Sequence, residues 1–96
     1  MAGTQLRRYE INPGEMDQFL VAWRGIVPIR AQFGFRVEFA YVNREENEFV
    51  WAITDDGDFA ADEAAYYASP ERAAADPNPA DHIAVMHLNM VTRAEP

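Results

Sequence analysis

The chain contains no cysteine and no lysine. Without cysteine it can form neither a disulfide nor a thiolate metal site, so packing or a partner subunit must stabilise its 96 residues. No apolar run approaches the ~18 residues that a membrane-spanning helix needs. The first eleven residues predict a strand and lack the pattern of a signal peptide. We therefore expect a single cytoplasmic domain over residues 1–96.

The charge of the chain is strongly one-sided. All eight basic residues are arginines, and with 16 acidic residues the formal net charge is −8. Such a chain repels nucleic-acid phosphates and anionic membranes, so we expect neither partner. Arginine without lysine also suggests a bacterial genome rich in G and C.

Metal chemistry has little support in the sequence. The two histidines, His82 and His87, are five residues apart on a predicted strand, so their side chains face opposite sides. No zinc-type spacing of His or Cys occurs. We expect no metal and no cofactor.

Three segments alternate apolar and polar residues, which predicts strands. They cover residues 4–11, 35–54 and 82–93, and the polar run at 43–47 makes the middle segment a hairpin. The alternation predicts that Phe35, Val37, Phe39 and Tyr41 share one face of the first hairpin strand, and that Phe49, Trp51 and Ile53 share one face of the second.

Two further segments predict helices. The first has apolar residues at spacings of three and four, with a kink or break expected at Pro28. Asp58 is the expected N-cap of a helix over 59–68, and Ser69 is the expected N-cap of a short piece over 70–75. The apolar face of the first helix consists of Met16, Phe19, Leu20, Trp23, Ile26 and Val27.

The resulting β-α-β-β-α-β order predicts an α+β, ferredoxin-like protomer, with helices on one face of an antiparallel four-stranded sheet. The strands, however, carry apolar residues on both faces. A monomer rarely exposes so large an apolar patch, so we expect a homodimer formed through the sheet faces, with a different protein on this face as the alternative. In the last strand Ile83, Val85 and Val91 are expected on one face, and Ala84, Met86, Leu88 and Met90 on the other.

Three stretches together resemble one known family. They are LRRYEINPGEMDQFLVAW from residue 6, FGFRVEFAYVNREENEFVWAI from residue 33 and YYASPERAA from residue 66. They resemble the NIPSNAP family of the dimeric α+β-barrel superfamily. The resemblance implies a ferredoxin-like protomer and a barrel-like dimer. It implies little about activity, because the superfamily includes cofactorless monooxygenases of aromatic polyketides, haem-degrading enzymes and non-catalytic stress proteins.

The sequence has no phosphate loop, no Ser-His-Asp order and no nucleophile elbow. We therefore expect a protein of unassigned role, with any small ligand being apolar or aromatic and lying between sheet and helices. One alternative is a cofactor-independent monooxygenase or isomerase acting on a phenolic polyketide-type substrate, and another is a non-catalytic interaction module. The candidate ligand-binding residues are Trp23, Phe39, Tyr41, Arg36 and Arg72, and the candidate catalytic residues are His87, Trp51 and Tyr67.

Each candidate also has an ordinary structural interpretation. Aromatic residues such as Trp51 commonly pair across strands to stabilise a sheet. His87, in mid-strand with apolar neighbours, is more typical of a hydrogen-bonded core or interface residue than of an acid or base. Arg72 beside Glu71 suggests a solvated pair, and Arg36 with Glu38 suggests an interface salt bridge.

Overall fold

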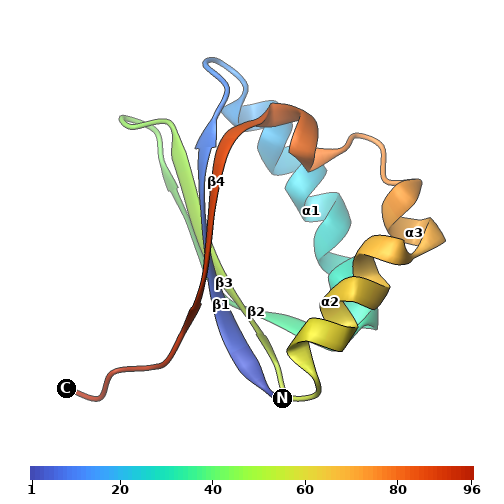
Figure 1. The fold of residues 1–96 in the computed structure, drawn as a ribbon. Helices are drawn as coiled ribbons and strands as arrows, with labels where there is room; N and C mark the ends of the chain where they lie inside the picture. The colour runs from blue at the N-terminus through green and yellow to red at the C-terminus, as the bar shows by residue number, and fades with distance from the viewer.

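The computed structural model describes all 96 residues, and its elements follow the predicted order (Figure 1). The strands form one antiparallel sheet in the order β2-β3-β1-β4, and all helices lie on one side of it (Figure 1). The ferredoxin-like fold is therefore confirmed. The elements are β1 (Gly3–Ile11), α1 (Met16–Gln32), β2 (Phe35–Asn43), β3 (Glu48–Asp55), α2 (Phe59–Ala68), α3 (Pro70–Ala73), a 3₁₀ turn (Pro79–His82) and β4 (Ile83–Val91).

None of these helices has the length and apolar character needed to cross a lipid bilayer.

Side-chain caps start α2 and α3, as the sequence predicts. Asp58 Oδ1 accepts a hydrogen bond from the backbone N–H of Ala61 at 3.1 Å. Ser69 Oγ accepts one from the N–H of Arg72 at 3.1 Å. The chain between helix and last strand therefore breaks and is capped again at Ser69.

The predicted break at Pro28 does not occur, because α1 continues to Gln32. Ile26 and Arg30 are buried on either side of Pro28. The packing of these two residues outweighs the one helical hydrogen bond that proline removes. The continuation places Arg30 over the sheet.

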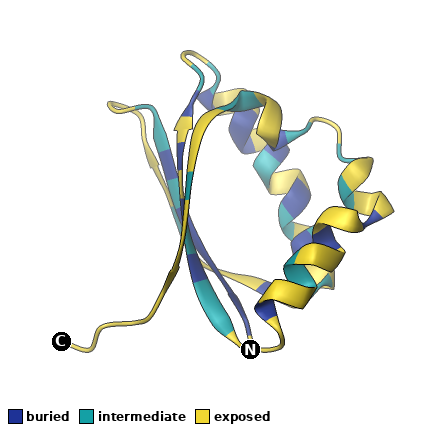
Figure 2. Cartoon of the chain, viewed as in Figure 1, coloured by how far each residue is buried: buried dark blue, intermediate teal, exposed yellow.

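The core lies between the helices and the face of the sheet that they cover (Figure 2). Phe49, Trp51 and Ile53 of β3 are at most 1% exposed, so the predicted inward face of this strand is confirmed. Trp23 of α1 packs edge-on against Trp51, with 5.4 Å between ring centroids. The core also includes Tyr9, Ile11, Phe19, Leu20, Ile26, Phe35, Phe59 and Tyr66.

A β-bulge in β2 changes the face of its side chains. The register with β3 shifts between Val37 and Phe39, so Glu38 is an extra residue in β2. Phe35, before the bulge, is buried under the helices, whereas Phe39 and Tyr41, after it, pair with residues of the uncovered face. The prediction that these aromatic residues share one face is therefore wrong.

A second irregularity lies between β1 and β4. The register shifts between Glu10 and Ile11, so Ile83 pairs with Ile11 on the helix side while Val85 pairs with Glu10 on the uncovered side. The predicted grouping of Ile83 with Val85 is wrong for this reason. Met86, Leu88 and Met90 point to the helix side of this edge strand and are 42%, 43% and 55% exposed.

Candidate functional site

A small cavity of about 30 Å³ lies between the sheet and the helices. It has room for about two water molecules. Its walls come from β1, β3, β4, all three helices and the 3₁₀ turn. The larger hollows, such as one of about 520 Å³ beside Pro13 and Arg44, are open depressions of the surface. The small cavity, which opens at a rim formed by Tyr67 and Met86, is the only one that gathers buried charged groups, and it is the candidate site.

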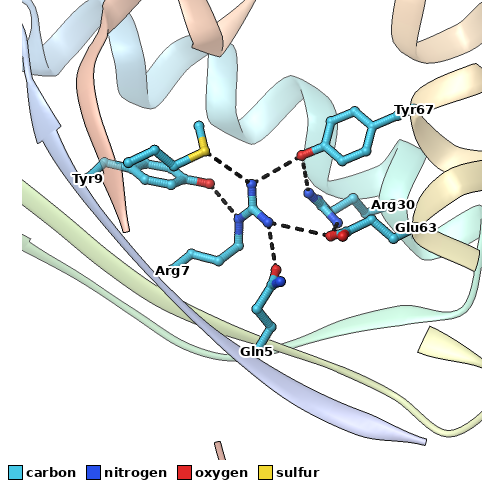
Figure 3. Close-up of polar contacts among 7 residues, drawn as sticks. Gln5, Arg7, Tyr9, Arg30, Glu63 and Tyr67 are labelled. Carbon is cyan, nitrogen blue, oxygen red and sulfur yellow. Dashed lines mark hydrogen bonds and ion pairs between the residues drawn. The ribbon is translucent and has the colours of Figure 1, made fainter. Parts of the chain in front are cut away.

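Arg7 lies at the centre of this site. It is 1% exposed, because β1 alternates and turns it toward the helices together with Gln5 and Tyr9. Its guanidinium donates to Tyr9 Oη at 2.6 Å, to Gln5 Oε1 at 2.6 Å and to Tyr67 Oη at 3.1 Å (Figure 3). Burial by itself lowers the pKa of Arg7. The electrostatic interactions and hydrogen bonds with Tyr9 and Tyr67 outweigh burial, so the pKa of Arg7 is raised.

Arg30 approaches the same tyrosine from the last turn of α1. It is 3% exposed, and its Nη2 donates to Tyr67 Oη at 3.0 Å. Its Cζ lies 4.3 Å from the ring centroid of Tyr66 and 5.3 Å from that of Phe35, which stabilises the cation. Burial, and then the charge of Arg7, lower the pKa of Arg30 below its ordinary value. Its Nε and Nη1 have no hydrogen-bond partner.

One carboxylate, from Glu63 of α2, faces the two guanidiniums (Figure 3). Glu63 Oε2 lies 3.5 Å from Arg7 Nη1 and 3.9 Å from Arg30 Nη1, and it accepts no hydrogen bond. Both distances exceed those of good charge-assisted hydrogen bonds. The site therefore holds two buried positive charges against one loosely placed negative charge.

Aromatic rings form most of the remaining wall. Trp23 and Trp51 line the cavity, and neither indole N–H has an acceptor. Tyr66 is 1% exposed, and burial raises the pKa of its hydroxyl. Tyr67 and Met86 are about half exposed and lie at the rim. The arrangement can hold a group that accepts hydrogen bonds next to an apolar body.

The structure brings together half of the residues that the sequence predicts for a site. Tyr67 contacts both buried arginines, and Arg72 also donates to Asn78 Oδ1 at 3.1 Å. The predicted residues that line the cavity are Trp23, Trp51, Tyr67 and Arg72.

The other half lies on the uncovered face of the sheet. His87 pairs with Arg8 in the sheet, and its Nε2 is 3.2 Å from Glu10 Oε2. Arg36 donates to Asp56 at 2.6 Å. The sheet therefore separates His87 from Trp51 and Tyr67, so one protomer does not assemble the three candidate catalytic residues at one place. The predicted residues on this face are His87, Arg36, Phe39 and Tyr41.

The sequence interpretation missed Arg7, Arg30 and Glu63. The burial of Arg7 could have been predicted, because alternation along β1 puts Arg7 on the same face as Tyr9 and Ile11. The burial of Arg30 could also have been predicted, because Arg30 follows Ile26 by four residues on the apolar face of α1. Both are arginines at positions that the periodicity assigns to the core.

No model of a known protein family matches the chain, and no curated protein is similar to it in sequence. Among solved structures, an uncharacterised NIPSNAP domain protein from Burkholderia xenovorans is 20% identical with a TM-score of 0.82, covering 98% of this chain and 95% of its own. A NIPSNAP family protein of unknown function from Agrobacterium tumefaciens is 18% identical with a TM-score of 0.85, covering 97% and 88%.

A third solved structure comes from another group. It is a candidate antibiotic biosynthesis monooxygenase from Bacteroides thetaiotaomicron, 16% identical with a TM-score of 0.77, covering 99% of this chain and 91% of its own. At these identities the likeness shows the fold. The ferredoxin-like protomer that the NIPSNAP resemblance implies is thus confirmed.

Proposed function

We propose that the chain is a NIPSNAP-type dimeric α+β-barrel protein whose protomers each bind a small apolar or aromatic molecule between sheet and helices. The observation that carries this proposal is the cavity wall, in which nine of 13 lining residues are hydrophobic. A volume of about 30 Å³ accommodates only part of such a ligand. The rest lies over Tyr67 and Met86 at the rim, which are 48% and 42% exposed.

Ligand binding can be followed through Trp23 and Trp51, because both tryptophans of the chain line the cavity. We expect benzyl alcohol or 1-naphthol to shift both indole N–H signals in ¹H–¹⁵N spectra saturably and to raise Tm with concentration. Trp51→Phe weakens this binding, whereas Tyr41→Phe, on the uncovered face, leaves it unchanged. Unchanged indole signals up to the solubility limit of both compounds would refute the proposal.

The uncovered face of the sheet supports dimerisation. Several apolar side chains on this face are exposed to solvent. A surface hollow of about 450 Å³ is lined by residues that include Leu6, Phe39 and Val91. A second copy related by a two-fold axis would bury this face with a matching one. The exposed fractions are 40% for Phe39, 67% for Tyr41, 41% for Val85 and 37% for Val91.

Light scattering tests the dimer. We expect a molar mass of twice the chain mass of 10.9 kDa. Phe39→Glu puts one charge from each copy into the interface, so this variant should be a folded monomer. Val21→Glu is the matched control, because Val21 is 59% exposed on α1, away from the sheet. A wild-type monomer at all concentrations would instead favour a different protein on this face.

The alternative is a cofactor-independent monooxygenase acting on a phenolic substrate. It is favoured by the fold shared with the candidate monooxygenase and by Trp51 and Tyr67 in the cavity wall. Against it, the lining residues include no histidine and no carboxylate to take a proton, and His87 lies across the sheet. Oxygen uptake with a panel of anthrone-like and quinol compounds tests it, with Trp51→Phe as the inactive control. If no compound of the panel causes oxygen uptake, the monooxygenase alternative fails and ligand binding remains as the proposed function.

A further inference from the structure

Side chains that line the cavity carry N–H donors that have no acceptor. Buried donors without a partner are rare and costly in folded proteins, so several at one place require an explanation. All of them belong to side chains that line the same cavity of about 30 Å³. They are Nε and Nη1 of Arg30, Nε of Arg72, and Nε1 of Trp23 and of Trp51.

The charge of the cavity wall is also unbalanced. The chain carries a net charge of −8, yet every charged residue that lines the cavity is an arginine. Arg7 and Arg30 have side chains that are 2% and 3% exposed. Glu63, the one acid within 4 Å of them, is not among the residues that line the cavity and has no hydrogen bond to either. The cavity therefore selects for negative charge.

The two buried arginines differ in how many of their guanidinium nitrogens have a hydrogen-bond acceptor in the protein (Figure 3). Arg7 donates from all three nitrogens, to Gln5, Tyr9 and Tyr67. Arg30 donates from Nη2 alone. A structural role explains Arg7, whereas the free donors of Arg30 point to a group that the protein itself does not supply.

We infer that the ligand of this cavity is an organic acid whose carboxylate is held by Arg30. This inference rests on the proposed function, in that a small molecule enters between sheet and helices. The cavity has room for about two oxygen-sized atoms, which matches a carboxylate head. The unpaired indole N–H groups of Trp23 and Trp51 are further donors at the same wall. The apolar body of the acid lies at the rim, over Tyr67 and Met86.

Benzoate and benzamide form the test pair, since they have the same shape and differ in charge. At pH 7 we expect benzoate to shift the indole N–H signals of Trp23 and Trp51 and to bind at least about tenfold more tightly than benzamide. Equal binding of the two would overturn the acid ligand while leaving the proposed function intact. If benzoate, benzamide and the neutral aromatics all leave both signals unshifted, both proposals fall together.

Variants identify the group that holds the acid. Arg30→Met should remove the preference for benzoate, and Arg24→Met, an exposed arginine of the same helix, should retain it. Glu63→Gln removes the competing carboxylate and should tighten benzoate binding several-fold. If Arg30→Met does not fold, Glu63→Gln tests the inference instead. Benzoate bound at another place on the protein would not respond to this substitution. Weaker or unchanged benzoate binding by Glu63→Gln would overturn the inference.

Discussion

The hydroxyl of Tyr67 provides the sharpest stability prediction. Its oxygen accepts hydrogen bonds from Arg7 Nη2 at 3.1 Å and from Arg30 Nη2 at 3.0 Å. Tyr67→Phe removes this oxygen and keeps the ring. Two buried guanidiniums then lose an acceptor, and Arg30 keeps no hydrogen bond at all.

The expected loss follows from these contacts. A hydrogen bond to a charged group contributes about 1.5–3 kcal/mol, so two independent bonds would contribute about 3–6 kcal/mol. The two bonds share one acceptor, and Tyr67 is 48% exposed, so water replaces the oxygen in part. We therefore expect the free energy of unfolding to fall by about 2 kcal/mol. For a chain of this length, Tm should fall by about 8–16 °C.

Urea unfolding followed by tryptophan fluorescence measures this change, at fixed protein concentration because dimerisation adds to stability. Val21→Thr is the control, since Val21 is 59% exposed on α1, away from both the cavity and the uncovered face of the sheet. Its unfolding free energy should change by less than about 0.5 kcal/mol. Equal effects of the two variants would show that the Tyr67 oxygen does not hold the arginines, and the reasoning would be refuted.

Two further stability predictions concern α2 and α3. Ser69→Ala removes the N-cap of α3 and should cost about 1 kcal/mol in chemical unfolding, whereas Ser69→Thr should cost much less. A hydrogen bond with Asp55, followed by burial and repulsion, raises the pKa of Asp62 above 3.8. The stability from protonated Asp62 is complete below pH 3.8 and is lost as pH rises through the raised pKa. Asp62→Asn should therefore have a higher Tm than wild type at pH 7 and no advantage in acid; a pH-independent difference would contradict this.

Much of the fold was predictable because its signals are local. The caps at Asp58 and Ser69 act within three residues, and both occur where the sequence predicts them. The alternation in β3 correctly placed Phe49, Trp51 and Ile53 toward the helices. The β-α-β-β-α-β order of these elements then predicted the ferredoxin-like fold.

The candidate site was predictable only in part. Trp23 and Trp51 follow from periodicity, because both occupy apolar faces that meet in the core. Arg7 and Arg30 occupy the same faces, but a charged side chain in a core position is costly without partners. Those partners, Tyr67 and Glu63 of α2, are more than 30 residues away in the sequence, so their approach cannot be inferred from spacing.

The sequence by itself determined the element order, the helix caps and the core face of β3, since each depends on residues a few positions apart. The tertiary structure decided which face Phe39 and His87 occupy and which residues surround Arg30. One extra residue at Glu38 turns every later side chain of β2 to the other face, and only pairing with β3 reveals it. Burial of a charge likewise depends on side chains brought together by packing, which no local pattern encodes.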